Sequence, residues 1–260
     1  MFKKVTAVVR ENKRIANNIY RMRLLCGEAD LEHFVPGQFA DLAVPGHGEL
    51  LLRRPLSICT VDAESQTATL VYQIKGKGTK AFSELRVGEG VDAILPIGRG
   101  FSLNSGDKTV FLVGGGVGIA PLLSAVQKWR DKNYEAFLGY RGKEYEYCLW
   151  DFKESCAKIF VTSDDGTLGD KGFVTQALEK RLNEALPDVI LACGPIPMLK
   201  ALKEVVKKFN VPAQVSMEQR MGCGFGACST CTCGIDAGGG LEYKKVCIEG
   251  PVFDLREVVL

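Results

Sequence analysis

A cluster of cysteines near the C-terminal end is the feature that most constrains this chain. Four cysteines fall within eleven residues and a fifth follows later: Cys223, Cys228, Cys231, Cys233 and Cys247. The segment is also rich in glycine, and it is too short to bury a hydrophobic core of its own. Small units of this kind need a disulfide or a metal site for stability. In a reducing compartment, metal ligation explains such a cluster better than disulfides do.

The spacing of these cysteines favours an iron–sulfur cluster. Cys223, Cys228 and Cys231 are spaced C-x4-C-x2-C, and Cys247 follows at a distance, which matches the plant-type [2Fe–2S] pattern. Four thiolates must converge on one small cluster, and glycines supply the backbone conformations that wrapping it demands. Zinc is the alternative, but it favours two C-x2-C pairs and only one is present. Cys233 is left outside the predicted ligand set.

The first hundred residues predict a small antiparallel β-barrel or sandwich. Segments such as "KKVTAVVREN" and "ATLVYQIKGKGT" alternate between apolar and polar residues, as half-buried strands do. Turn signals recur about every ten residues, which is typical of this class of fold.

From Lys108 onward the pattern changes to strands alternating with helices. "TVFLVGGG" predicts a buried strand that runs into a glycine turn, and "APLLSAVQKWRDK" predicts a helix. Further strands and helices follow, so we expect an open parallel sheet with helices on its faces. The chain therefore divides into three predicted units: a barrel at 1–101, an α/β unit at 102–210 and a cysteine-loop unit at 211–260.

Charge and hydropathy exclude several classes of protein. With 33 Lys and Arg against 31 Asp and Glu, the net charge is +2, which provides no basis for binding nucleic acid or an anionic membrane. The N-terminus lacks the apolar core of a signal peptide. The longest uncharged run follows Lys108, and its glycines and Pro121 favour a strand, a turn and a helix over a membrane span. We expect a cytoplasmic protein.

Three glycine-containing loops predict a nucleotide site. "VFLVGGGVGIAPLL" has the form G-x-G-x-x-P and offers backbone N–H groups and a helix N-terminus to a pyrophosphate. "ACGPIPM" and "TSDDGTLGDKG" end two further strands. In an open parallel sheet the ligand binds at the carboxyl ends of the strands, where all three loops should meet.

Hydrolytic chemistry finds no support in the sequence. His33 and His47 are the only histidines, and neither lies near a serine or cysteine motif. No residue is recognisable as a general base placed to remove a proton from carbon. The arginine in "RRPLS" could instead hold a phosphate or an anionic flavin ring.

"RPLS", "GGGVGIAPL" and "CGP", in this order, resemble the motifs of the ferredoxin–NADP reductase superfamily. With "MGCGFGACSTC" and the ending "CIEGPVFDLREV", the whole chain resembles the electron-transfer subunits of class 1B dihydroorotate dehydrogenases. These are iron–sulfur flavoproteins of pyrimidine synthesis.

The resemblance implies three sets of binding residues. For FAD they are Arg54, Pro55, Leu56, Ser57, Val71, Tyr72, Gln73, Gly78 and Thr79. For NAD they are Gly114, Gly115, Gly116, Gly118, Cys193, Gly194 and Pro195. For the [2Fe–2S] cluster they are Cys223, Cys228, Cys231 and Cys247.

The resemblance also implies a partner and a direction of electron flow. Dihydroorotate is oxidised at an FMN on a separate catalytic subunit, and electrons cross to the [2Fe–2S] cluster, to FAD and then to NAD⁺. We expect a heterotetramer with two copies of each subunit, and no oxidation of dihydroorotate by this chain alone. The charges of Arg141, Lys143, Glu144 and Glu146 leave the choice between NAD and NADP open.

Two other functions compete with this one. The nearer is the flavin and iron–sulfur subunit of an NADPH–ferredoxin oxidoreductase or a sulfhydrogenase, which has the same modules. The other is a non-catalytic interaction module that carries zinc. The latter would make the flavin and phosphate signals accidental.

Overall fold

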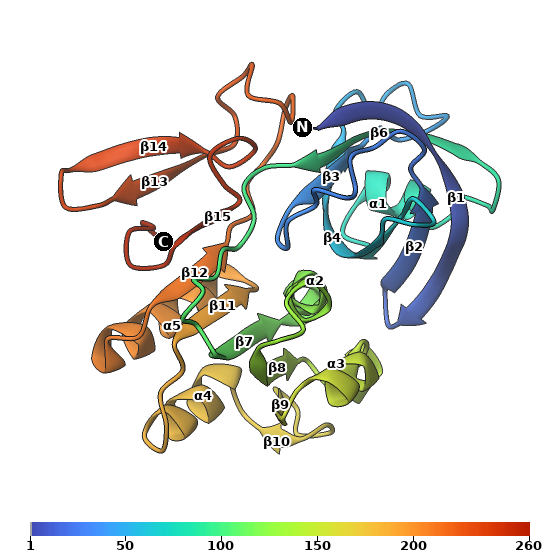
Figure 1. The fold of residues 1–260 in the computed structure, drawn as a ribbon. Helices are drawn as coiled ribbons and strands as arrows, with labels where there is room; N and C mark the ends of the chain where they lie inside the picture. Colours follow the sequence, from blue (N-terminus) through green and yellow to red (C-terminus); the bar gives the residue numbers. More distant parts are fainter. Residues whose placement is uncertain (1) are drawn as a thin grey trace.

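The computed structural model describes residues 2–260 and begins with an antiparallel β-barrel (Figure 1). Its closed strand order is β1-β2-β5-β4-β3-β6. The strands are β1 (Lys3–Ala16), β2 (Ile19–Leu25), β3 (Phe39–Leu42), β4 (Arg54–Asp62), β5 (Thr67–Gln73) and β6 (Gly90–Ile97), and α1 (Lys77–Phe82) follows β5. Alternate residues such as Ala7 and Val9 fill the interior. The predicted barrel is confirmed.

The second part is an open sheet with strand order β10-β9-β8-β7-β11-β12-β15 within the described residues. Its strands are β7 (Thr109–Gly115), β8 (Asn133–Tyr140), β9 (Lys158–Ser163), β10 (Asp170–Lys171), β11 (Val189–Cys193), β12 (Ala213–Ser216) and β15 (Val252–Asp254). All pair in parallel except β15, which runs antiparallel to β12. The predicted parallel sheet is confirmed.

Helices cover both faces of this sheet. They are α2 (Ala120–Lys128), α3 (Leu149–Ser155), α4 (Val174–Leu182) and α5 (Ile196–Phe209), with 3₁₀ turns at Gly116–Ile119 and Lys143–Tyr145. Phe111 and Val113 of β7 pack with α4 and α5, whereas Val110 and Leu112 pack with α2 and α3. The two-residue period of a strand thus feeds two cores. In the part of the chain that is described, no helix is long and apolar enough to cross a membrane.

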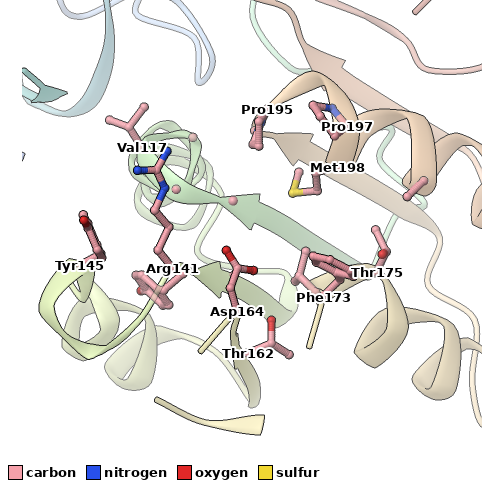
Figure 2. Close-up of a pocket in the computed structure, with 18 of the residues that line it drawn as sticks. Val117, Arg141, Tyr145, Thr162, Asp164, Phe173, Thr175, Pro195, Pro197 and Met198 are labelled. Carbon is pink, nitrogen blue, oxygen red and sulfur yellow. The ribbon is translucent and has the colours of Figure 1, made fainter. Parts of the chain in front are cut away.

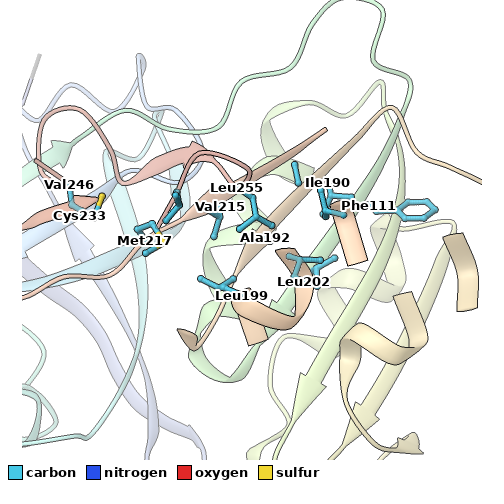
Figure 3. Close-up of a cluster of buried hydrophobic side chains, with 14 of the residues drawn as sticks. Phe111, Ile190, Ala192, Leu199, Leu202, Val215, Met217, Cys233, Val246 and Leu255 are labelled. Atoms are coloured by element: carbon cyan, nitrogen blue, oxygen red, sulfur yellow. The ribbon is translucent and has the colours of Figure 1, made fainter. Parts of the chain in front are cut away.

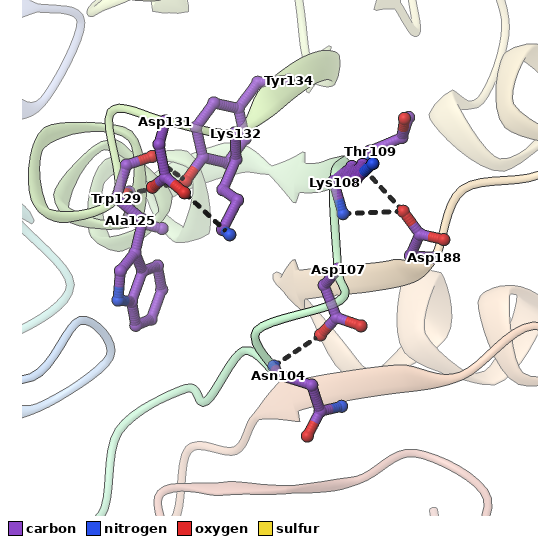
Figure 4. Close-up of polar contacts among 10 residues, drawn as sticks. All are labelled: Asn104, Asp107, Lys108, Thr109, Ala125, Trp129, Asp131, Lys132, Tyr134 and Asp188. Atoms are coloured by element: carbon purple, nitrogen blue, oxygen red, sulfur yellow. Dashed lines mark hydrogen bonds and ion pairs between the residues drawn. The ribbon is translucent and has the colours of Figure 1, made fainter.

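Polar contacts fix the point at which the chain enters β7 (Figure 4). The Asp188 carboxylate, just before β11, accepts hydrogen bonds from the backbone N–H groups of Lys108 and Thr109, each at 2.8 Å. The Tyr134 hydroxyl, on β8, donates to the carbonyls of Ala125 and Trp129 at the C-terminal end of α2. The Asp188 contacts hold the start of β7 beside the start of β11, the two strands whose ends carry glycine turns.

The cysteine-rich segment joins the sheet at both of its ends. β12 leads into the cysteine loop, the hairpin of β13 (Thr232–Asp236) and β14 (Leu241–Lys245) follows, and the chain returns to the sheet at β15. One apolar core runs from Leu199 and Leu202 of α5 through Met217 to Cys233 and Val246 (Figure 3). The unit boundaries at 101 and 210 remain predictions, but β12 and β15, which fall within 211–260, belong to the larger sheet.

Candidate functional site

A cavity of about 490 Å³ lies at the carboxyl ends of β7, β8, β9 and β11. We call it the sheet-edge cavity. Its volume lies in the usual range for small-molecule sites. It is the place where the three glycine-containing loops were expected to meet. Five residues of the predicted nucleotide set line it: Gly115, Gly116, Gly118, Gly194 and Pro195.

The glycine turn after β7 approaches the turn after β11 very closely. A Cβ atom on Gly118 would lie 2.6 Å from the carbonyl carbon and oxygen of Cys193 and 2.7 Å from the nitrogen of Gly194. Gly116 has φ +54°, which favours glycine. Its carbonyl accepts a hydrogen bond from the Tyr147 hydroxyl at 2.7 Å. The two turns can therefore pack this closely only because position 118 lacks a side chain.

Two predicted nucleotide residues do not line this cavity. Gly114 lies beneath the turn, where a Cβ would be 2.9 Å from the Ile119 side chain. Cys193 is buried at the end of β11, and burial raises the pKa of its thiol to about 12. Both residues shape the turns from behind, and their assignment as ligand contacts remains a prediction.

The far end of the sheet-edge cavity is polar and aromatic. Figure 2 shows Arg141 and Asp164 directed into one space, with Tyr145 and Phe173 on opposite sides of it and Met198 facing it from the side of the glycine turns. The Thr162 hydroxyl is buried here without a hydrogen-bond partner among residues 2–260. Asp164 follows β9 and offers a carboxylate that can accept hydrogen bonds from ribose hydroxyls.

A second cavity of about 220 Å³ lies against the barrel and is called the barrel cavity below. It gathers most of the predicted flavin residues, which come from β4, from β5 and from the turn into α1. Those that line it are Pro55, Leu56, Ser57, Val71, Tyr72, Gln73 and Thr79. A planar ring could lie across this concave, mostly apolar surface.

Arg54 and Gly78, the remaining two flavin predictions, lie against each other outside that lining. A Cβ on Gly78 would be 2.5 Å from Arg54 Nε, so the arginine packs directly on the glycine backbone. The Arg54 guanidinium donates to the carbonyls of Leu52 and Arg53. This arrangement places a cation at the N-terminal turn of α1, beside Thr79, where a pyrophosphate would fit.

The two cavities meet. Five residues line both of them: Gln73, Lys75, Val117, Gly118 and Glu218. A ring bound in the barrel cavity would therefore face a nicotinamide in the sheet-edge cavity. The barrel cavity is also lined by the chain that enters and leaves the cysteine loop, through Met217, Met221 and Val246.

The predicted cluster ligands approach one another in two pairs. The Cys228 backbone N–H donates to Cys223 Sγ at 3.3 Å. Hydrogen bonds from the Thr230 hydroxyl and backbone N–H, together with contacts to Cys223, lower the pKa of the Cys228 thiol to about 6. Cys231 and Cys247 are both buried. Burial is the main cause that raises the pKa of the Cys247 thiol to about 12, and the neighbouring Cys231 thiol is the second cause.

Paired thiols suit a two-iron cluster, which takes two cysteines at each iron. Within residues 2–260, no three Cys, His, Asp or Glu side chains converge on a point suited to one metal ion. Gly224 and Gly226 have φ +77° and +89°, the left-handed turns expected of a loop that wraps a cluster. The four-cysteine ligand set remains a prediction. Cys233 is buried on β13, in the apolar core.

Several residues at these sites were not identified from the sequence. Thr162 and Asp164 stood in a quoted loop, but nothing singled them out within it. Lys75 and Glu218 lie where the two cavities meet, although 143 positions separate them in the sequence. Only the topology brings them together, so no local pattern could have found them.

Comparisons with known proteins agree with this arrangement. Residues 218–259 match the family model of the iron-sulfur cluster binding domain of dihydroorotate dehydrogenase B. The chain is 40% identical over 262 residues to the dihydroorotate dehydrogenase B (NAD(+)) electron transfer subunit of Bacillus pumilus, covering 99% of each chain. It is 39% identical to the subunit of the same name from Caldanaerobacter subterraneus, covering 98% of each.

Solved structures extend the comparison to the fold. The NADH-dependent reduced ferredoxin-NADP oxidoreductase superposes with a TM-score of 0.87 at 30% identity, over 98% of this chain and 90% of that one. Phthalate dioxygenase reductase shares the fold, with a TM-score of 0.67 at 19% identity, over 93% of this chain and 76% of that one. The full-length identity to the curated relatives decides the family. The chain belongs to the dihydroorotate dehydrogenase B electron transfer subunits.

Proposed function

We propose that this chain is the NAD⁺-reducing electron-transfer subunit of a dihydroorotate dehydrogenase in pyrimidine synthesis. It accepts electrons from the FMN of a separate catalytic subunit and passes them, through a [2Fe–2S] cluster and FAD, to NAD⁺. We further propose that it works in the cytoplasm, in a heterotetramer with two copies of each subunit. Dihydroorotate itself is oxidised on the partner.

The observation that carries this proposal is the order of the sites. The sheet-edge cavity and the barrel cavity share a wall at Gly118 and Glu218. Val246 lines the barrel cavity and is the neighbour of the buried Cys247. The sheet-edge cavity, the barrel cavity and the cysteine loop are therefore contiguous in that order, which is the order that a route from a cluster through a flavin to NAD⁺ requires.

The order also suits the chemistry of the bound groups. A nicotinamide exchanges two electrons as hydride, an iron–sulfur cluster exchanges one, and a flavin can do both, so FAD belongs between them. Ser57 and Gln73 would hold the flavin ring, and Arg54 with the Gly78 turn would hold its pyrophosphate. Gly118 would leave room for the nicotinamide, and Asp164 would accept hydrogen bonds from a ribose.

The second candidate is the flavin and iron–sulfur subunit of an NADPH–ferredoxin oxidoreductase or sulfhydrogenase. It draws support from the 30% identity to the ferredoxin-NADP oxidoreductase structure. The higher identity over the full length of the dihydroorotate dehydrogenase B relatives favours the first function.

The test is reconstitution with a catalytic subunit. This chain is co-expressed with a dihydroorotate dehydrogenase catalytic subunit of the same source and purified without air, and NADH formation is followed after adding dihydroorotate and NAD⁺. We expect the pair to make NADH and each subunit alone to make none. Cys228→Ser should abolish the reaction in the pair. Cys156→Ser is the matched control and should retain it, because this half-buried thiol packs with the core beneath α2 and α3 and not with the core of the cysteine loop.

Two results would contradict the proposal. If this chain alone oxidised dihydroorotate, the division of labour between subunits would be wrong. If the two chains did not associate, yet this chain reduced a dye with NADPH, the second candidate would replace the first.

A further inference from the structure

Asp41 is the most unusual buried group outside the sites described so far. It lies on β3, its exposed fraction is 0%, and neither carboxylate oxygen accepts a hydrogen bond from any of residues 2–260. Buried carboxylates are normally paired because removing a charge from water is costly. A barrel strand does not need an acid at such a position, so another role must account for it.

The carboxylate lies directly against the cysteine loop. A Cβ atom added to Gly224 would overlap Asp41 Oδ2, with the rest of the carboxylate beside it. Gly224 has φ +77° and follows Cys223 in the chain. The Asp41 carboxylate thus contacts the residue that follows a predicted cluster ligand, although 183 positions separate Gly224 from Asp41 in the sequence.

The charged groups around Asp41 favour its ionised form only in part. Burial raises the pKa of the Asp41 carboxyl to about 6, while the positive charges of Arg53 and Arg54 oppose that rise. Arg53 does not bond the carboxylate: its guanidinium donates to the Asp41 backbone carbonyl, to the Asp92 carbonyl and to the Asp92 carboxylate on β6. At neutral pH, Asp41 therefore keeps a poorly neutralised negative charge beside the loop.

We propose that Asp41 is a positioning residue that holds a negative charge against the cysteine loop and so lowers the reduction potential of the [2Fe–2S] cluster. The inference rests on the proposed cluster site. Net charge and burial around a cluster set its potential, and a nearby carboxylate disfavours the addition of an electron to a group that is already anionic. A lower potential favours onward transfer from the cluster to FAD.

The test compares potentials rather than turnover. The complete chain, purified without air with its FAD and cluster, is titrated with a chemical reductant at pH 8, and the cluster is followed by its visible and electron paramagnetic resonance signals. We expect Asp41→Asn, which keeps the shape and removes the charge, to raise the cluster potential. At pH 5, where the wild-type carboxyl is mostly protonated, the difference should shrink.

Asp92→Asn is the matched control. It removes a carboxylate from the neighbouring strand that Arg53 at 2.7 Å and Lys4 at 3.3 Å already neutralise, so it should shift the potential less. Asp41→Ala is used if the amide variant does not bind a cluster. Equal potentials in the wild type and the Asp41 variants would overturn the inference, as would loss of the cluster from both variants, because the role would then be structural. A wild-type chain without a [2Fe–2S] signal would instead refute the proposed function.

Discussion

Replacing Gly118 with alanine tests the closest backbone approach in the nucleotide site. The added Cβ would lie 2.6 Å from both the carbonyl carbon and the oxygen of Cys193, and 2.7 Å from Gly194 N. Ordinary contacts of a Cβ begin at 3.4 Å, so the two turns would have to separate by roughly 0.8 Å. Backbone atoms lie on the far side of the contact, and no flexible side chain can move away to relieve it.

The cost of that separation can be estimated. Overpacking a close-packed site typically costs about 1–3 kcal/mol, and each kcal/mol lowers Tm by roughly 2–4 °C in a chain of this size. We therefore expect Gly118→Ala to melt about 2–12 °C below the wild type. Gly106→Ala is the control, because nothing lies within 4 Å of a Cβ at that position. Its melting temperature should stay close to that of the wild type.

Binding should suffer together with stability, because Gly118 lines both cavities. Flavin content after purification and the Kd of NADH, measured by titrating the flavin absorbance, report on the two sites separately. We expect Gly118→Ala to weaken NADH binding and Gly106→Ala to leave it unchanged. If both variants had the same Tm and the same Kd, the close approach of the two turns would be wrong.

Three further changes test other parts of the structure. Asp164→Ser should raise the NADPH to NADH ratio of kcat/KM about tenfold. The Asp164 carboxylate would repel the 2′-phosphate of NADPH, since like charges about 4 Å apart repel by roughly 1–4 kcal/mol. An unchanged ratio would mean that the ribose binds elsewhere. N–H groups of Thr109 and Lys108 lower the pKa of Asp188, so its contribution to stability is present at neutral pH and is lost as pH falls. In Asp188→Asn, the free energy of unfolding, measured with urea, should therefore fall less between about pH 5 and pH 2 than in the wild type. An equal fall in both proteins would contradict this. Cys233→Ala should keep the visible absorbance of the cluster, and losing it would add Cys233 to the ligands.

Local patterns were sufficient to predict the modules. Strand alternation identified the barrel, and the change to strands and helices after Lys108 identified the parallel sheet. The turn from Gly114 to Gly118 could be predicted because its conformation depends on glycines within one short segment. Most residues of the predicted flavin set were likewise brought to one cavity, since β4 and β5 are neighbours in the barrel.

Contacts between distant segments could not be predicted in this way. Asp41 looks like a solvent-facing residue in "FADL", yet it is buried because the cysteine loop covers it. β15 has three residues and an apolar start, a pattern too short to distinguish from a loop. Its place at the sheet edge depends on pairing with β12, which lies 36 residues earlier in the chain.

The pairing of β12 with β15 explains how a loop without a hydrophobic core of its own is held at a fixed place. The Met217 N–H donates to the Pro251 carbonyl at 2.8 Å, just where the chain leaves the sheet and returns to it. The Arg99 N–H, on the link between barrel and sheet, donates to the Gly250 carbonyl at 2.5 Å. Both ends of the cysteine loop are therefore bound to the elements that enclose the barrel cavity. Because electron transfer weakens steeply with distance, these backbone bonds, together with the apolar core that reaches Cys233 and Val246, would keep the cluster close to the flavin.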